Sequence, residues 1–77
     1  MNGNDVKPGP ELYQKVRGGF VARGTTLAAW CREHGHNPTN ARSALVGAWN
    51  GPKGRALRQR LAEDSGVIRA SHSVASA

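Results

Sequence analysis

A short run of hydrogen-bonding side chains between positions 37 and 43 is the part of the chain best suited to chemistry with a partner. Asparagine can bind adenine through two hydrogen bonds, arginine can do the same to guanine, and a threonine methyl group can contact the thymine methyl group. The residues predicted for DNA base readout are Thr39, Asn40, Arg42 and Ser43. In the alternative interpretation, Asn37 and Thr39 only cap a helix and Arg42 is a solvated surface residue.

Basic side chains dominate the central part of the chain. The protein has 77 residues and a formal net charge of +6, and residues 12–62 contain nine basic residues and one acid, Glu33. Such a charge attracts polyanions, of which nucleic acid is the most common in a cell, although basic residues can also serve solubility alone. The residues expected to contact the DNA backbone are Asn37, Lys53, Arg55 and Arg58.

Other chemistries have little support in the sequence. Cys31 and His34 share one predicted helical face, but no third group is placed to complete a catalytic site. The single cysteine excludes an intrachain disulfide and a cysteine-rich zinc site, and the three histidines lack further metal ligands. Trp30 and Trp49 fall on apolar stripes, which favours core packing over stacking on unpaired bases. We therefore expect no enzymatic activity, no cofactor and no metal.

The elements that must position these side chains begin with a helix predicted over residues 11–23. Apolar residues recur there at four-residue spacing, which is typical of a helix with one buried face. Gly18 and Gly19 weaken such a helix by about 1 kcal/mol each relative to alanine. Their presence implies packing support or a close backbone approach.

Two further helices are predicted on either side of a glycine turn. The first opens at Thr25 or Thr26, either of which can cap backbone amides, and it stops at Gly35. Asn37 is a good N-cap for the next helix, and Pro38 suits the first helical position.

The inward face of this third helix and the start of a fourth are also predicted. The inward positions are Ala41, Ala44, Leu45, Ala48 and Trp49. The segment Asn50-Gly51-Pro52 is a strong stop signal. A fourth helix is expected over residues 52–65, with Gly66 as its C-cap.

Together these elements predict an all-α fold, a small open bundle of four or five short helices that contains a helix-turn-helix over residues 26–49. Residues 1–9 are expected to form a flexible N-terminal arm, residues 10–68 the DNA-binding domain and residues 69–77 a disordered tail, with Val67 and Ile68 packed on the core. The predicted core residues are Leu12, Val16, Phe20, Leu27, Trp30, Cys31, Ala41, Leu45, Trp49, Leu57 and Leu61.

Residues 24–45 and 48–66 resemble the Ner family of small phage regulators, a branch of the lambda-repressor-like helix-turn-helix proteins. The features that carry the resemblance are Thr26 to Ala28, His34 with Gly35, Pro38 with Thr39, Ser43 to Leu45, and Pro52 to Gly54. The resemblance implies transcriptional regulation, typically repression of phage promoters, with positions 39, 40, 42 and 43 at the start of the recognition helix. Arg55 replaces an acidic residue usual in the family, and the family's closing Trp-Pro-Ser-Arg segment is absent.

The sequence therefore favours a sequence-specific binder of double-stranded DNA, a phage or prophage regulator that acts as a homodimer or as paired monomers on an operator. A second hypothesis is an excisionase-type or architectural factor that bends DNA. A third is a protein-interaction module that binds no nucleic acid. No apolar run approaches the length needed to cross a bilayer, so we expect a cytoplasmic protein without membrane contact.

Overall fold

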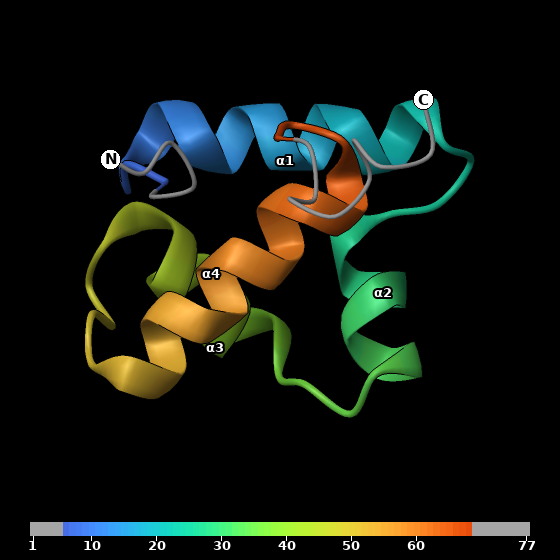
Figure 1. The fold of residues 1–77 in the computed structure, drawn as a ribbon. Coiled ribbons are helices and arrows are strands. Elements are labelled where there is room, and N and C mark those ends of the chain that lie inside the picture. Colours follow the sequence, from blue (N-terminus) through green and yellow to red (C-terminus); the bar gives the residue numbers. More distant parts are fainter. Residues whose placement is uncertain (1–5, 69–77) are drawn as a thin grey trace, which may run out of the picture.

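Four α-helices form the part of the chain that the computed structural model describes, residues 6–68 (Figure 1). These residues contain no strand, so the predicted all-α class is confirmed. The helix nearest the N-terminus spans the whole width of the molecule, and the last helix crosses in front of the third (Figure 1). The four helices are α1 (Pro10–Ala22), α2 (Leu27–Glu33), α3 (Pro38–Val46) and α4 (Pro52–Ser65).

Short-range capping signals set where the helices begin. The Thr26 hydroxyl oxygen accepts a hydrogen bond from the Ala29 amide at 3.1 Å, which caps α2. The Asn37 side-chain oxygen accepts one from the Thr39 amide at 2.7 Å, which caps α3. A proline occupies the first turn of α1, α3 and α4, where the missing amide proton costs nothing. The predicted start of α3 and the predicted extent of α4 are confirmed, and α1 lies one residue earlier than expected.

Glycine residues set where α2 and α3 end. The backbone reverses after α2 through Gly35, whose φ of 73° lies in the left-handed region that glycine adopts without steric cost. The prediction that α3 continues to Trp49 is wrong, because Gly47 adopts a φ of 96° and α3 ends at Val46. The amides of Gly47 and Trp49 both donate to the Ser43 carbonyl, at 3.1 and 3.0 Å, and thereby close the helix end.

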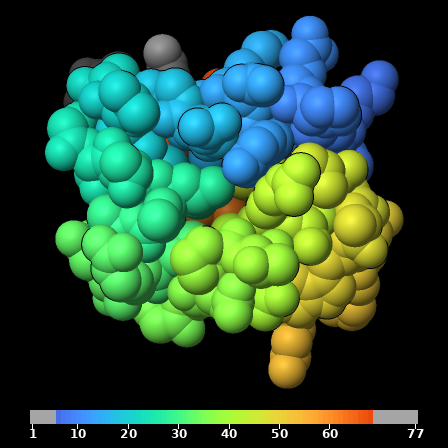
Figure 2. Space-filling model, turned by 180° about the vertical axis from the view of Figure 1, so that it is seen from behind, coloured from blue at the N-terminus to red at the C-terminus, as the bar shows by residue number. Residues whose placement is uncertain are grey.

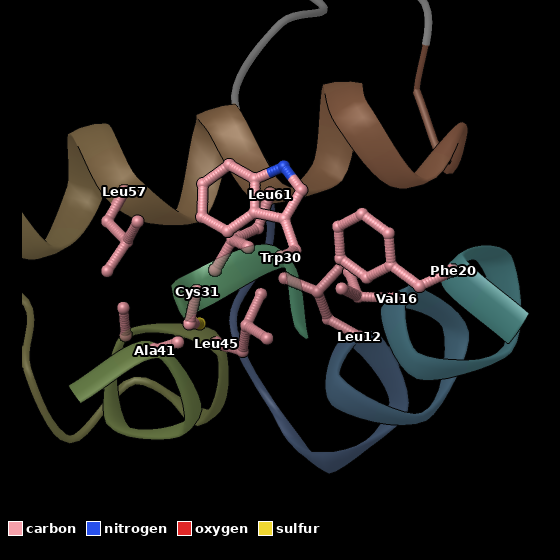
Figure 3. Close-up of a cluster of buried hydrophobic side chains, with 10 residues drawn as sticks. Leu12, Val16, Phe20, Trp30, Cys31, Ala41, Leu45, Leu57 and Leu61 are labelled. Atoms are coloured by element: carbon pink, nitrogen blue, oxygen red, sulfur yellow. The ribbon is translucent and has the colours of Figure 1, made fainter. Parts of the chain in front are cut away.

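The core is built from apolar side chains of all four helices (Figure 3). Two predicted members, Leu27 and Trp49, are only partly buried and pack against its edge, because one opens α2 and the other follows the end of α3. Ala44, which was expected to face inward, is also part of the core. The buried core residues are Leu12, Val16, Phe20, Trp30, Cys31, Ala41, Ala44, Leu45, Leu57 and Leu61.

The approach of α1 to α4 explains one of the two glycines inside α1. A Cβ atom at Gly19 would collide with the backbone carbonyl of Ser65, at the end of α4. A Cβ atom at Gly18 would meet nothing. The expected close backbone approach therefore exists at Gly19 and not at Gly18.

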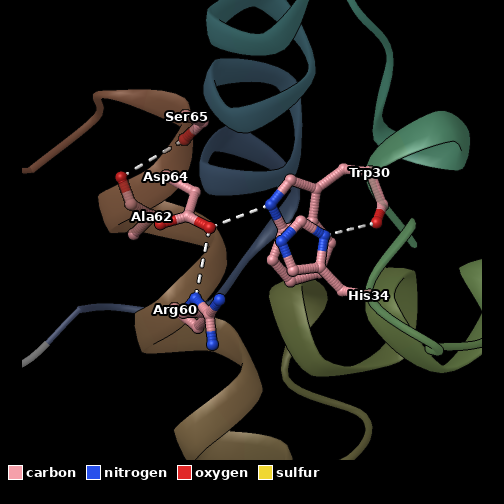
Figure 4. Close-up of polar contacts among 6 residues, drawn as sticks. All are labelled: Trp30, His34, Arg60, Ala62, Asp64 and Ser65. Atoms are coloured by element: carbon pink, nitrogen blue, oxygen red, sulfur yellow. Dashed lines mark hydrogen bonds and ion pairs between the residues drawn. The ribbon is translucent and has the colours of Figure 1, made fainter. Parts of the chain in front are cut away.

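Polar contacts fasten α2 to the end of α4 (Figure 4). The Trp30 indole donates to Asp64 Oδ2 at 2.9 Å, and the same oxygen lies 3.2 Å from Nε of Arg60. The His34 ring stacks on Trp30 with centroids 4.1 Å apart. The Ser65 hydroxyl donates to the Ala62 carbonyl within α4 (Figure 4). α2, the shortest helix described, is thus held by a buried side chain with a specific hydrogen-bond partner.

The segment before α1 lies against the domain. Val6 packs on the core, and the Gly9 amide donates to the Leu45 carbonyl at 2.9 Å. The expectation of a free arm is therefore wrong for residues 6–9, while residues 1–5 and the predicted tail, 69–77, lie outside the described residues. Val67 packs on the core as expected. None of the helices within residues 6–68 has the length and apolar character needed to span a membrane.

Candidate nucleic-acid interface

The first turns of α3 present polar side chains to solvent. Asn37, Thr39, Asn40 and Arg42 are exposed, whereas Ser43 is half-buried. Because successive helical residues are rotated by about 100°, Thr39 lies between Asn40 on one side and Arg42 on the other. Ala41, Ala44 and Leu45 face the core and fix the rotation of the helix. Thr39, Asn40 and Arg42 thus lie on the exposed side of α3, and Ser43, one turn after Thr39 on the same side, is half-buried.

The Asn37 side chain, predicted to contact the DNA backbone, already serves the protein. Its oxygen accepts the hydrogen bond from the Thr39 amide that caps α3. The residue is exposed, so its side-chain NH₂ group is the part that remains for a partner.

Arg42 extends from α3 toward a tyrosine of α1. Its guanidinium carbon lies 5.7 Å from the centre of the Tyr13 ring, and that of Arg17 lies 5.4 Å from the same centre. Both distances fall in the range of cation–π attraction. No role was predicted for Tyr13 or Arg17. Their four-residue spacing places them on one helical face and was visible in the sequence, whereas the approach of Arg42 requires the fold.

These residues border a groove of about 450 Å³ in which α1, α2 and α3 meet. Figure 2 shows this face, where the blue atoms of α1, the green atoms of α2 and the yellow-green atoms of α3 surround a hollow. The lining includes three residues with hydroxyl groups, Tyr13, Thr26 and Thr39, and it contains no acidic residue. The groove is accessible, positively charged and able to donate several hydrogen bonds.

The basic residues at the start of α4 divide into exposed and buried ones. Lys53 and Arg55 are exposed, as a contact with a DNA backbone requires. The prediction for Arg58 is wrong, because this residue is buried, with 6% of its surface exposed. Its Nη1 atom donates to the Ala44 carbonyl at 3.1 Å and to Asn50 Oδ1 at 3.0 Å.

The helical spacing explains why Arg58 faces inward. It follows Gly54 by four residues and precedes Ala62 by four, and both of these residues are buried. Ala44 belongs to the last turn of α3, whose carbonyl groups lack partners within the helix and carry partial negative charge. Arg58 supplies that partner and a compensating positive charge.

Lys7 lies near Arg55 on the surface, although the sequence predicts this residue within a free arm. It borders a hollow with Pro8, Asn50, Arg55 and Arg58. The signal that positions it is the hydrogen bond from Gly9 to the end of α3, which the sequence does not reveal.

The segment that contains α3 and most of α4 is strongly basic. No acidic residue occurs between positions 34 and 62, which hold five basic residues. Two acids that follow bond to neighbouring side chains, Glu63 to Gln59 at 3.0 Å and Asp64 to Arg60. Every formally charged side chain of α3 and of the first two turns of α4 is therefore basic.

The residues considered for other chemistry are engaged elsewhere. Burial raises the pKa of the Cys31 thiol, which favours its protonated and less nucleophilic form at neutral pH. His34 lies with Nδ1 2.8 Å from the Trp30 carbonyl. Within residues 6–68, no group of three or more His, Cys, Asp or Glu residues could hold a metal ion. Trp30 is buried, and Trp49 is half-buried beside Lys53 and Arg60.

Comparison of the chain with protein-family models, curated proteins and solved structures finds no match. Its function is therefore to be inferred from the surface described above. That surface combines exposed hydrogen-bonding groups on α3 with exposed basic residues on α1 and α4. It suits a polyanion that also displays hydrogen-bonding groups, as nucleic acid does.

Proposed function

We propose that the protein is a sequence-specific binder of duplex DNA, in which α2 and α3 act as a helix-turn-helix and α3 enters the major groove. The observation that carries the proposal is the exposure of Thr39, Asn40 and Arg42 at the start of α3, within a segment that contains no acidic residue. A recognition helix presents its first turns to base edges, where such side chains bind. The role is binding without catalysis.

The exposed residues divide into two roles. Thr39, Asn40 and Arg42 contact base edges, and Ser43, which is half-buried, contributes from the next turn of α3. Lys53 and Arg55 contact phosphates and fix the position of the protein on the duplex without reading sequence. Asn37 adds a backbone contact through its NH₂ group. Arg58 has no part in DNA contact, because its charge serves the protein interior.

The biological role proposed is transcriptional regulation of phage or prophage genes in the cytoplasm, with repression as its usual form. This assignment rests on the sequence resemblance of residues 24–45 and 48–66 to the Ner regulators. Two copies on one operator would place their α3 helices about one turn of DNA, 34–36 Å, apart. The operator would then contain two related half-sites at that spacing.

Selection of bound sequences from a randomised duplex pool tests this function. The selected duplex and a random duplex are then titrated with the wild-type protein and with Asn40→Ala. We expect tighter binding of the selected duplex, and a loss of about 1–3 kcal/mol in Asn40→Ala that is confined to it. Gln14→Ala is the matched control, because it removes an exposed amide from α1 and is expected to bind as the wild type does.

The salt dependence distinguishes DNA binding from a protein-interaction role. Neutralising four to six phosphates gives a log–log slope of affinity against salt of roughly −3 to −6. Equal affinity for the selected and random duplexes would reject sequence-specific readout. Absence of binding to any duplex at low salt would reject the proposed function as a whole.

A further inference from the structure

The groove between α1, α2 and α3 holds two arginines on one aromatic ring. Arg17 and Arg42 come from different helices, yet both guanidinium groups lie within 6 Å of the centre of the Tyr13 ring. A guanidinium group above a ring keeps its N–H donors free at its edge. Both arginines can therefore bind a ligand while the ring restricts their movement.

We propose that this groove is a binding site for a backbone phosphate of duplex DNA, with Arg17 as the phosphate-binding residue. Tyr13 acts as a positioning residue that holds Arg17 and the readout residue Arg42 together. The inference rests on the proposed function, because Arg42 can take part in readout only if α3 faces DNA. It adds a contact from α1, a helix outside the helix-turn-helix.

The chemistry of the lining favours a phosphate over a neutral ligand. Arginine binds phosphate oxygens through two parallel N–H donors, and the hydroxyl groups of Thr26 and Thr39 border the same groove. No acidic residue in the lining opposes an anion. Thr39 and Arg42 border the groove and also belong to the exposed start of α3, so a strand whose bases meet α3 would bring a phosphate close to Arg17.

A charge-matched pair of variants on α1 tests the phosphate site. Arg17→Ala and Lys15→Ala each remove one exposed positive charge, but Lys15 borders a different hollow, beside Val67. Both are titrated with a selected duplex and a random duplex of about two helical turns at several salt concentrations. We expect Arg17→Ala to weaken binding to both duplexes about tenfold and to reduce the salt slope by about one. Lys15→Ala is expected to bind like the wild type.

A second pair of variants tests the role of the ring. Tyr13→Phe keeps the ring, whereas Tyr13→Leu removes it and frees both arginines. We expect Tyr13→Phe to bind within about twofold of the wild type and Tyr13→Leu to lose about three- to tenfold, with a smaller preference for the selected duplex. Circular dichroism of each variant verifies that it is folded.

The outcomes separate this inference from the proposed function. If the wild type binds DNA and Arg17→Ala has the salt slope of the wild type, or loses no more affinity than Lys15→Ala, the phosphate site is wrong. Equal binding by Tyr13→Leu and Tyr13→Phe, both folded, would overturn the positioning role. A wild type that binds neither duplex would overturn the proposed function itself, and this site with it.

Discussion

Arg58 places a positive charge in the interior of the domain, where two oxygen atoms accept hydrogen bonds from its guanidinium group. Its Nη1 group bonds to the last turn of α3 through Ala44 and to the loop before α4 through Asn50. The residue therefore connects the proposed recognition helix to the helix that bears the proposed phosphate contacts. Its contribution is to stability, and Arg55, three residues earlier, is the exposed counterpart.

Replacement of Arg58 by alanine is expected to lower the free energy of unfolding by about 2–4 kcal/mol, because the Ala44 carbonyl loses a charged donor in a buried place. Arg55→Ala is expected to change it by no more than about 0.5 kcal/mol. Urea denaturation measures both values. In DNA titrations under folded conditions, Arg55→Ala should reduce the salt slope and Arg58→Ala should not. The reverse pattern would contradict the assignment of the two arginines.

Cys31 makes stability depend on pH in the alkaline range. Burial raises the pKa of its thiol in the folded protein, whereas the unfolded chain ionises near the ordinary value of about 8.5. Above that pH the unfolded chain loses the thiol proton while the folded protein keeps it, which stabilises the unfolded state relative to the folded state. The contribution of the Cys31 thiol to the free energy of unfolding is therefore complete below the unfolded pKa, and it declines as pH rises toward the folded pKa. We expect the wild type to lose more stability than Cys31→Ala between about pH 8 and pH 10. Parallel unfolding curves for the two proteins over this range would refute the expectation.

Single residues could be assigned from the sequence where a local pattern decided them. The apolar spacing identified Leu12, Val16 and Phe20 as core, and all three are buried. Arg58 was predicted to lie on the surface because arginine is charged. Its position, one residue after Leu57 and four before Ala62, is on the inward face of α4. The Tyr13 and Arg42 contact joins α1 to α3, and no local pattern predicts such a pairing.

At the scale of elements, the crossing of α1 and α4 positions the helix that carries the Tyr13 ring. The backbones approach so closely at Gly19 that the Ser65 carbonyl occupies the space of a Cβ atom. Gly18 is exposed and has open space around it. The two adjacent glycines therefore differ in the constraint that the fold imposes on them.

The pair Gly19→Ala and Gly18→Ala separates packing from helix propensity. We expect Gly19→Ala to lower the free energy of unfolding by about 2 kcal/mol or more, because α1 and α4 must move apart. Gly18→Ala is expected to raise it by about 0.5–1 kcal/mol, because alanine favours the helix and restricts the unfolded chain. Chemical denaturation followed by circular dichroism gives both values, and equal effects would show that the crossing does not constrain Gly19.

Helix starts were predictable because their signals are local, whereas one helix end was not. Thr26 and Asn37 cap the helices that their residue types suggest. The end of α3 was missed because Trp49 continues the apolar spacing of the helix and so suggested another turn. In the structure the helix ends before Gly47, which has a positive φ, and the loop that follows places Trp49 at the edge of the core.

At the scale of the whole molecule, the described surface offers little apolar area for a stable dimer. Among residues 6–68, Val21 is the exposed large hydrophobic residue, at 65%. Obligate dimers usually bury a continuous apolar patch. The basic side chains of α3 and of the start of α4 also oppose contact between two copies through these elements.

We therefore expect the free protein to be a monomer of 8.2 kDa at micromolar concentrations. Two copies are expected to meet only on DNA that contains two half-sites. Sedimentation equilibrium with and without such a duplex measures both states. A stable dimer in the absence of DNA would contradict this expectation and point to an interface beyond the surface described.

The claim that α3 presents its first turns to duplex DNA is tested most directly by recording amide NMR shifts during titration of the isotope-labelled protein with a selected duplex. We predict that the largest shifts fall on residues 37–43, with further shifts at positions 53–55 and around position 17. Shifts confined to the second half of α4, or no shifts at a duplex concentration that saturates binding, would contradict the claim.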